Sequence, residues 1–221
     1  MLLVGDCELF GLEESEELSF VVRGTGYPLI SVVGRPSEEA IREAVAGAAG
    51  YEVLVPPENE THVAAALPGW EAVSATLHLL GDEPRLPRVP AGTVRLLEPS
   101  ELDSIEGLPS RLRSEFAVAA RRSPIAASLA GGRPVAFCYS VQTESLWDIS
   151  INTLEGHRGR GYASLCIAYM IEHLRPLRPV WGAEETNLPS LRLAAKLGFV
   201  PADEVLVFHP PGARGAGAAL R

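Results

Sequence analysis

Several features are scarce in this sequence, and each absence excludes a class of protein. The 221 residues include three cysteines, Cys7, Cys138 and Cys166, which are odd in number and lack metal-ligand spacing, as is typical of a reducing compartment. No apolar run reaches the roughly 18 residues of a membrane-spanning helix. Residues 1–6 lack a basic leader and meet an acid at once, which argues against a secretory signal. We therefore expect a cytoplasmic protein with no membrane partner.

Positive charge is also scarce. The net charge is −9 with a pI near 5.1, and 18 of the 19 basic residues are arginine, with Lys196 the only lysine. An acidic surface repels phosphate backbones, so we expect no nucleic-acid partner. A small basic pocket for a phosphorylated cofactor stays compatible with this balance. An apolar fraction of 47% and a charged fraction of 21% exclude general disorder.

The length corresponds to about one and a half typical domains. Composition changes most sharply at residues 81–92, where three prolines and two glycines disfavour helix and strand. This predicts an N-terminal α/β domain over 1–82, a linker over 83–92 and a larger domain over 93–209. Residues 210–221 have too little apolar bulk to pack and are expected to form a flexible tail.

Hydrophobic periodicity and turn residues predict an α/β protein with a mixed sheet and helices on both of its faces. In the N-terminal part the predicted strands are 18–23, 28–33, 51–55 and 73–80, and the predicted helices begin at Pro36 and Thr61. In the C-terminal part the predicted strands are 93–97, 125–130, 135–141, 146–154, 180–183 and 205–209. The helices there are one capped by Ser100 and three others at 109–120, 162–174 and 189–197.

The later parts of the two halves share an order of events: strand, asparagine, helix, glycine with an aromatic residue, and strand. Asn59 and Gly69-Trp70 mark this order in the first half, and Asn187 and Gly198-Phe199 mark it in the second. Two interpretations stay open. The N-terminal region is a degenerate duplicate of the C-terminal domain, or two common strand–helix–strand units match by chance.

The stretch from Asp148 to Ser164 carries the clearest chemical signal. An alternating strand runs into a turn with glycines at 156, 159 and 161, and then directly into an apolar helix. Such a junction exposes successive backbone N–H groups, to which the helix N-terminus and two arginines add positive charge. This predicts a pyrophosphate site. It is not a Walker loop, because Tyr162 and Ala163 stand where lysine and Ser/Thr are required, and its glycine spacing differs from the dinucleotide fingerprint.

Two motifs resemble those of one superfamily. Arg158-Gly-Arg-Gly-Tyr-Ala163 resembles the Arg/Gln-x-x-Gly-x-Gly/Ala motif of the GNAT superfamily of acyl-CoA-dependent N-acyltransferases. Asn187-Leu-Pro-Ser-Leu-Arg-Leu-Ala-Ala-Lys-Leu-Gly-Phe199 resembles its second signature, in which an asparagine and a small residue precede a helix ending in Leu-Gly-Phe. The resemblance covers about residues 93–209 and is greatest to a bacterial subgroup with an extra N-terminal region. It implies the GNAT acyl-CoA N-acyltransferase fold, preceded by a smaller α/β domain.

The resemblance also implies acetyl-CoA as co-substrate and a division of roles among residues. Main-chain groups of Ile151 and Thr153 would pair with the pantetheine like an added strand, and Asn187 and Ser190 would contact it from the opposite wall. The pyrophosphate would be held by the turn, which consists of Arg158, Gly159, Arg160, Gly161, Tyr162 and Ala163.

Acyl transfer to an amine requires the amine to lose a proton, because a free alkylamine has a pKa of about 10.4. A carboxylate where the strands splay apart could accept this proton, directly or through water. Asp148 is the preferred candidate and Glu144, just before its strand, is the second. Glu184 and Glu185 lie on the opposite predicted strand and stay open as alternatives.

One position departs from the superfamily's pattern. Many members carry a general-acid tyrosine in the second signature, where this chain has Ala194. Tyr139 or Tyr162 could replace it only if the fold brings one of them to the sulfur.

The remaining polar and aromatic residues have structural interpretations. Trp147 and Trp181 are expected in the core or a pocket wall, Cys166 in the core and His157 exposed in its turn. The other histidines lack ligand spacing, so no metal is predicted.

The sequence thus predicts an N-acetyltransferase that transfers an acetyl group directly to a primary amine. The acidic surface favours a cationic small molecule, or a protein N-terminus, as the unidentified acceptor. Two alternatives stay open: a non-catalytic acyl-CoA-binding regulatory protein on the same fold, and an RNA- or nucleotide-binding module that uses the Arg-Gly turn. The N-terminal half has Gly34-Arg-Pro-Ser-Glu38 in place of a glycine-rich turn. It is expected to lack cofactor binding and to wall the acceptor pocket, complete the sheet or form a homodimer.

Overall fold

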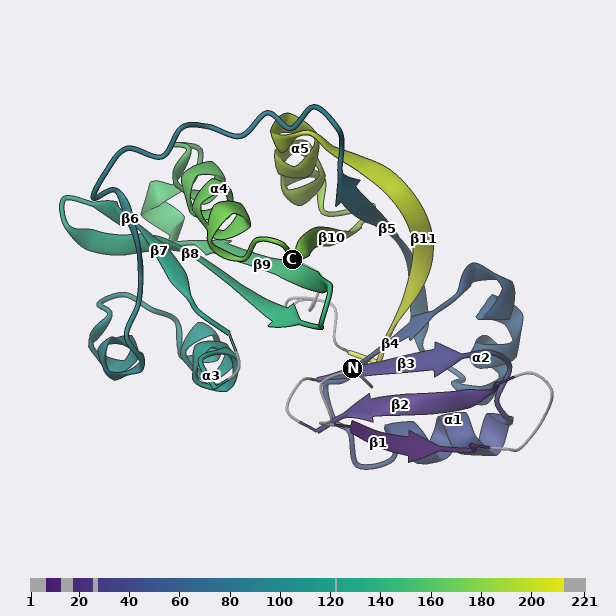
Figure 1. Cartoon of the computed structure of the whole chain (residues 1–221). Helices are drawn as coiled ribbons and strands as arrows, with labels where there is room; N and C mark the ends of the chain where they lie inside the picture. Colours follow the sequence, from purple (N-terminus) through teal and green to yellow (C-terminus); the bar gives the residue numbers. More distant parts are fainter. Residues whose placement is uncertain (1–6, 13–17, 26–27, 122, 213–221) are drawn as a thin grey trace. The chain divides into compact units, whose positions relative to one another are not determined.

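The structure is a computed structural model that describes residues 7–12, 18–25, 28–121 and 123–212 (Figure 1). Three predicted features lie wholly or partly outside these residues: the start of the chain, the turn at Gly26 and most of the tail. The chain divides into two compact units. Unit 1 contains the described residues of Met1–Leu77, Ala183–Leu188 and Ala202–Arg221, and unit 2 contains those of His78–Gly182 and Pro189–Pro201.

Unit 1 is built mainly from the first third of the chain. Its elements are β1 (Cys7–Phe10), β2 (Phe20–Gly24), β3 (Leu29–Val33), α1 (Glu38–Val45), β4 (Glu52–Val55), the 3₁₀ turn η2 (Pro57–Asn59), α2 (Glu60–Ala66) and most of β5 (Glu71–Leu80). Strands β1, β2 and β3 are antiparallel neighbours, and β4 runs parallel to β3.

The sequence of α1 explains both its start and its buried face. Ser37 is the N-cap, and its hydroxyl accepts a hydrogen bond from the Ala40 N–H at 3.2 Å. Ala40, Ile41 and Ala44 recur at helical spacing and are buried against the sheet. Burial of a side chain such as Ile41 contributes about 1.5–3 kcal/mol. The helix is therefore held by its cap and by one apolar face.

Unit 2 contains most of the remaining elements. These are β6 (Val94–Leu96), η3 (Pro99–Ser104), α3 (Ser110–Ala119), β7 (Ala126–Ala130), β8 (Arg133–Gln142), β9 (Leu146–Thr153), η4 (Glu155–His157), α4 (Tyr162–His173), most of β10 (Arg178–Glu184), most of α5 (Leu188–Leu197) and the start of β11 (Phe199–His209).

Two helices cover opposite faces of the β7–β8–β9 meander (Figure 1). On one face Phe116 of α3 packs against Phe137 and Tyr139 of β8, with ring centroids 5.0 and 5.1 Å apart. On the other, the Cys166 thiol of α4 donates to the carbonyl of Ala126 in β7 at 3.2 Å. This confirms the predicted mixed α/β architecture and the core position of Cys166.

The order of elements repeats along the chain, but the last strand of each repeat pairs with a strand of the other repeat. The run β1-β2-β3-α1-β4-α2-β5 has the same order as β7-β8-β9-α4-β10-α5-β11. Within unit 1 the strand order is β1-β2-β3-β4-β11-β5, so β4 is paired antiparallel with β11. Within unit 2 the order is β5-β10-β9-β8-β7-β6. Duplication with exchanged final strands accounts for this order, and it stays an interpretation.

Most predicted elements agree with the structure to within a few residues. The last strand, predicted at 205–209, begins earlier, at Phe199. Two other differences concern η3 and β1. The helix expected to be capped by Ser100 is the 3₁₀ turn η3, whose N-cap is Glu98, with a reciprocal bond from the Glu98 N–H to the Glu101 carboxylate at 2.8 Å. It starts earlier because Pro99 suits the first helical position. The short strand β1 has no counterpart among the predicted strands. The predicted domain limits, 1–82, 83–92, 93–209 and 210–221, stay a prediction. The two compact units group residues by packing, and each unit combines several segments of the chain.

Candidate active site

The parallel pairing of β9 with β10 ends halfway along β9. Three residue pairs join the strands, from Arg178–Leu146 to Val180–Asp148. Pairing of β9 with β8 continues much further, to the pair Ala136–Thr153. The C-terminal half of β9 therefore has a neighbour on one side only, and the opening begins beside Asp148.

The direction of the β9 backbone groups follows from the bonds at its two ends. The Thr143 N–H donates to the Leu146 carbonyl and the Leu154 N–H donates to the Val135 carbonyl, both at 2.8 Å. The main-chain N–H and C=O groups of even-numbered β9 residues therefore point toward β8. The main-chain groups of odd-numbered residues point to the opposite side of the strand. Ile151 and Thr153 thus present main-chain groups to the opening, as an added strand requires. The Thr153 carbonyl already accepts a hydrogen bond from Arg158 Nε at 3.3 Å, which leaves its N–H available.

The turn after β9 leads into an uncapped helix N-terminus. Gly161 is the N-cap of α4, with φ of 86° and no side-chain hydrogen bond. The first turn of a helix has N–H groups without intrahelical partners, so α4 presents them at this point. Arg158 and Arg160 are exposed beside the turn. The arrangement suits a phosphate group, as the sequence predicts.

The glycines of this turn leave space that a ligand can use. Gly159 and Gly161 have φ of 74° and 86°, and a Cβ atom added at either would meet no other heavy atom within 4 Å. Their requirement is therefore conformational, since other residues adopt this region only with strain. An open glycine turn at a helix N-terminus, next to an unpaired strand edge, fits a chain-like ligand with a pyrophosphate such as coenzyme A.

Asp148 is the acid that faces the start of this opening. Its side chain is half-buried, and desolvation raises its pKa from 3.8 to about 7, opposed by a hydrogen bond from the Ile149 backbone. Glu144, the second candidate, is exposed in the turn before β9. Glu184 and Glu185 are placed in unit 1. Asp148 is therefore the candidate with a perturbed acidity suited to proton transfer near neutral pH.

Neither Tyr139 nor Tyr162 replaces the general-acid tyrosine that the superfamily carries at the position of Ala194. Ala194 is fully buried, so the structure has no tyrosine hydroxyl there. Tyr139 donates its hydroxyl proton to Glu115 at 2.7 Å and accepts a hydrogen bond from Asn152 at 3.1 Å. Tyr162 is the first residue of α4, and its ring meets that of His157 edge-on with centroids 6.0 Å apart.

The residues predicted for the opposite wall begin helix α5. Ser190 is buried, and its hydroxyl accepts a hydrogen bond from Trp181 Nε1 at 2.9 Å, which fixes the start of the helix against β10. Asn187 is half-buried, and its N–H donates to the Glu184 carbonyl at 2.9 Å. Contacts of Asn187 and Ser190 with a cofactor stay a prediction.

Ser128 supports the turn and was not recognised in the sequence. Its hydroxyl, in the middle of β7, donates to the Tyr162 carbonyl at 2.8 Å and so anchors the first turn of α4. A lone serine in an apolar strand carries no pattern that indicates this role. The prediction for His157 is wrong, since its ring is half-buried and its Nδ1 atom is buried with no hydrogen-bond partner among the described residues.

The corresponding turn of unit 1 is closed by its own side chains. The Asn59 amide donates to the Gly34 carbonyl, and His62 Nε2 lies 2.7 Å from the Pro36 carbonyl. The Arg35 N–H donates to the Ser19 hydroxyl at 3.0 Å. The bond to Ser19 occupies an N–H group of the kind that a phosphate turn leaves free, and the other two bonds hold the turn closed. They support the expectation that this half does not bind the cofactor.

Comparison with known proteins defines the class of the fold and shows which family model the chain matches. Residues 126–208 match the family model described as GNAT acetyltransferase. That segment covers β7 to β11, including the turn, the opening and α5. The chain has the fold of GNAT acyltransferases, and the match of residues 126–208 to the GNAT acetyltransferase model agrees with the resemblance seen in the sequence.

Solved structures agree in fold along most of the chain. A GCN5-related N-acetyltransferase-like protein from Streptococcus suis has a TM-score of 0.66 at 18% identity, covering 92% of this chain and 88% of the other. A GCN5-related N-acetyltransferase from Kribbella flavida has a TM-score of 0.64 at 15% identity, covering 97% and 93%. A tandem GNAT protein from the clavulanic acid biosynthesis pathway has a TM-score of 0.53 at 18% identity, covering 86% and 77%.

No curated protein matches the chain. Within the described residues, no helix combines the length and hydropathy needed to span a membrane. The same part of the chain holds no cluster of three or more histidine, cysteine, aspartate or glutamate residues suited to a metal ion.

Proposed function

We propose that the protein is an acetyl-CoA-dependent N-acetyltransferase. The observation that carries this proposal is the end of β9–β10 pairing at Asp148, with the uncapped glycine turn of α4 at the far end of the same strand. A ligand lying along β9 has its pyrophosphate at the turn and its reactive end near Asp148. The match of residues 126–208 to the GNAT acetyltransferase model supports acyl transfer.

In the proposed reaction, the nitrogen of a neutral primary amine attacks the carbonyl carbon of the thioester. The N–C bond forms and the C–S bond breaks. Asp148 accepts the proton that the amine nitrogen loses, and a proton from solvent converts the departing thiolate to the free thiol. The N–H groups of Ile151 and Thr153 orient the pantetheine, and the first-turn amides of α4, with Arg158, hold the pyrophosphate.

Gly161→Asp is expected to weaken acetyl-CoA binding at least tenfold. The new carboxylate would stand at the helix N-terminus, where it repels pyrophosphate and occupies the amides. Isothermal titration of acetyl-CoA into wild type and variant measures the effect.

Gly132→Asp is the matched control. Gly132 lies in the β7–β8 turn with φ of 81°, and a Cβ there also meets nothing within 4 Å, so the backbone strain is the same. This variant is expected to bind acetyl-CoA as wild type does. Wild type that fails to bind at micromolar concentration, or equal losses in both variants, would contradict the proposal.

The buried Ala194 favours a second candidate, a non-catalytic acyl-CoA-binding protein. Coenzyme A is an acceptable leaving group without a dedicated acid, so the missing tyrosine is compatible with catalysis. Thiol release with a broad panel of primary amines separates the two functions. Tight acetyl-CoA binding without release above the no-amine rate would favour the regulatory role.

A further inference from the structure

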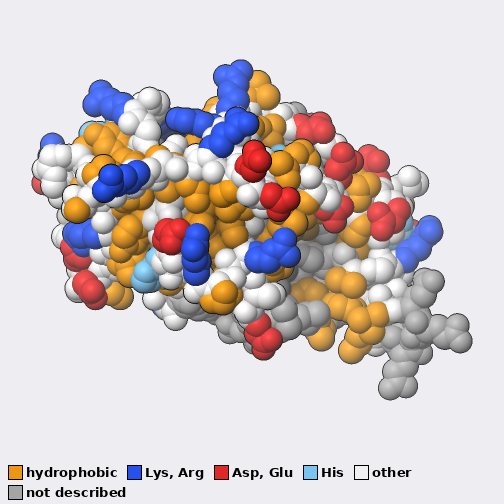
Figure 2. All heavy atoms as spheres, turned by 45° about the horizontal axis from the view of Figure 1, so that its top comes forward, with side chains coloured by type: hydrophobic (Ala, Val, Ile, Leu, Met, Phe, Trp, Pro, Cys, Tyr) orange, Lys and Arg blue, Asp and Glu red, His pale blue; other side chains and the backbone are white. Residues whose placement is uncertain are grey.

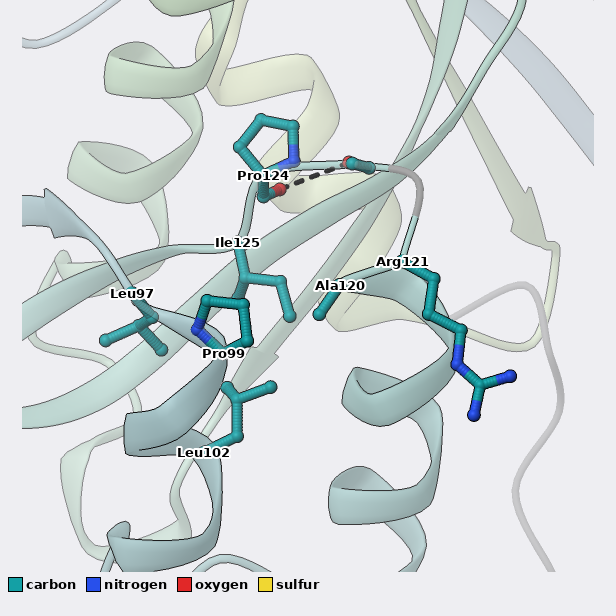
Figure 3. A pocket seen from close by; sticks show the side chains of 8 residues that line it. Leu97, Pro99, Leu102, Ala120, Arg121, Pro124 and Ile125 are labelled. Atoms are coloured by element: carbon teal, nitrogen blue, oxygen red, sulfur yellow. Dashed lines mark hydrogen bonds between the residues drawn. The ribbon is translucent and has the colours of Figure 1, made fainter.

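A hollow of about 300 Å³ lies between η3, the end of α3 and the start of β7 in unit 2 (Figure 3). Its walls are mostly apolar, formed by Leu97, Pro99, Leu102, Ala120, Pro124 and Ile125. Figure 3 shows several of these side chains turned toward one another. The volume is at the lower end of the range for small-molecule sites. It admits one apolar side chain of amino-acid size.

The hollow lies on the same face of the sheet as Asp148. Leu97, Leu102 and Ile125 belong to one apolar cluster with Tyr139 of β8. Tyr139 is paired with Ser150 of β9, and Asp148 lies two residues before Ser150 on that strand, so Tyr139 and Asp148 share a face of the sheet. Adjacent strands are about 4.8 Å apart. The hollow therefore lies on the same face of the sheet as Asp148, the proposed base.

A hydroxyl ties the hollow to the end of β8. Ser123 lines it, and its Oγ atom lies 2.8 Å from Ser140 Oγ and accepts a hydrogen bond from the Gln142 amide at 3.2 Å. These two residues flank Val141 along β8. The Ser123 hydroxyl is fully engaged, so it is a fixed wall and not a free donor for a ligand.

The charge at the rim indicates what accompanies the apolar group. Arg121 is the only charged residue among those that line the hollow, and its guanidinium has no hydrogen bond or ion pair among the described residues. Figure 3 shows this side chain extending outward from the apolar walls. The planar guanidinium group of such an arginine suits a carboxylate, which it can bind through two parallel hydrogen bonds. Among the described residues that line the hollow none is acidic, so a cationic group has no ion-pair partner there.

We infer that the hollow is the acceptor site and takes a small primary amine that carries an apolar group and a carboxylate, the chemistry of a free apolar amino acid. The apolar group fills the hollow, the carboxylate meets Arg121 and the amine remains free for the opening at Asp148. This inference rests on the proposed N-acetyltransferase activity. It replaces the cationic acceptor that overall composition favours, because the local charge of the site is opposite to the net charge.

L-Leucine, L-phenylalanine and L-methionine, with L-leucinamide and spermidine for comparison, test the inference. Titration into protein saturated with coenzyme A measures binding without turnover, and thiol release with acetyl-CoA measures kcat/KM. At least one of the three amino acids is expected to bind and react at least tenfold better than L-leucinamide and spermidine. Arg121→Gln is expected to remove that preference for the carboxylate.

Ala120→Phe should fill the hollow and weaken amino-acid binding at least tenfold, with acetyl-CoA affinity unchanged. Arg133→Gln is the charge-matched control, since Arg133 is an exposed arginine that does not line the hollow. The inference is overturned if none of the three amino acids binds at millimolar concentration, if L-leucinamide or spermidine binds equally well, or if Arg121→Gln behaves like Arg133→Gln. Each of these results, obtained with normal acetyl-CoA binding, leaves the proposed function standing. Loss of acetyl-CoA binding in wild type would instead contradict the proposed function itself.

Discussion

Asp148→Asn is expected to lower kcat by about 10²–10⁴-fold, the usual contribution of general acid–base catalysis. Asparagine keeps the size of the side chain but cannot accept the amine proton. The affinity for acetyl-CoA should stay within about twofold of wild type, because the glycine turn and the β9 edge are untouched. Thiol-release kinetics and isothermal titration measure the two quantities separately.

The pH dependence of the wild type should report the same group. The base is active only when deprotonated, and the pKa of Asp148 is raised to about 7 by desolvation. Activity should therefore rise with pH through about 7, and this limb should disappear in Asp148→Asn. Asp103→Asn is the control, since the Asp103 side chain is 96% exposed and makes only a 3.8 Å ion pair. If Asp148→Asn keeps kcat within tenfold while Glu144→Gln loses it, Asp148 is not the base.

The same substitution should stabilise the fold above neutral pH. The carboxyl pKa is higher in the folded state than the value of about 3.9 in the unfolded chain, so the folded state binds more protons between these values. The free energy of unfolding therefore falls as pH rises from about 4 to 7. Removing the ionisable group should raise stability by about 2 kcal/mol at pH 8, allowing for partial solvent screening, and by little at pH 4. Urea unfolding at both pH values checks this sign.

The motifs and the elements that carry them could be predicted because they rest on local patterns. The alternation along β9, the glycines before α4 and the Asn–helix–Gly-Phe order of α5 are each read within about a dozen residues. Residues 126–208 also match the model of the family that these motifs indicated. The perturbed acidity of Asp148 could not be read in this way, because it depends on which atoms surround the carboxylate.

Partners far apart in the sequence were the features that patterns missed. Hydrophobic alternation predicts that β11 is a strand but not that it pairs with β4, more than 140 residues earlier. Likewise Ser128 and Tyr162 meet only because α4 packs on β7. The hollow is lined by described residues from two segments, one around η3 and one that follows α3, and neither carries a motif. Tertiary packing supplies this information.

Another feature that joins distant parts of the sequence is a buried cluster in unit 1, formed by one histidine and two glutamates. His209 Nε2 lies 2.9 Å from Glu184 Oε1, and His209 Nδ1 lies 3.4 Å from Glu52 Oε1. All three residues are buried, and they come from β11, β10 and β4. Each ring nitrogen therefore lies near a carboxylate oxygen of a different buried acid. The histidine thus joins two buried acids that would otherwise repel each other.

His209→Ala is expected to lower the free energy of unfolding by about 3–5 kcal/mol, the range for breaking a buried ion pair. Most of that loss comes from removing the ring that two buried carboxylates contact, together with a cavity at the end of β11. His173→Ala is the control, because His173 is exposed and only stacks on Tyr169, so its loss should stay within about 0.5 kcal/mol. Urea unfolding at neutral pH compares the two variants.

Two contributions to the loss of stability can be distinguished: the lost contacts of the carboxylates with the histidine, and the cavity that the ring leaves. If the loss of the histidine contacts dominates, adding Glu52→Gln and Glu184→Gln to His209→Ala should recover a large part of the stability, because a neutral amide costs far less to bury than a carboxylate. If the cavity dominates, the triple variant should be no more stable than His209→Ala. A loss below about 1 kcal/mol in His209→Ala would show that the cluster does not hold β4, β10 and β11 together. Because Glu184 also accepts the N–H of Asn187, the single variant should in addition weaken acetyl-CoA binding if Asn187 contacts the cofactor.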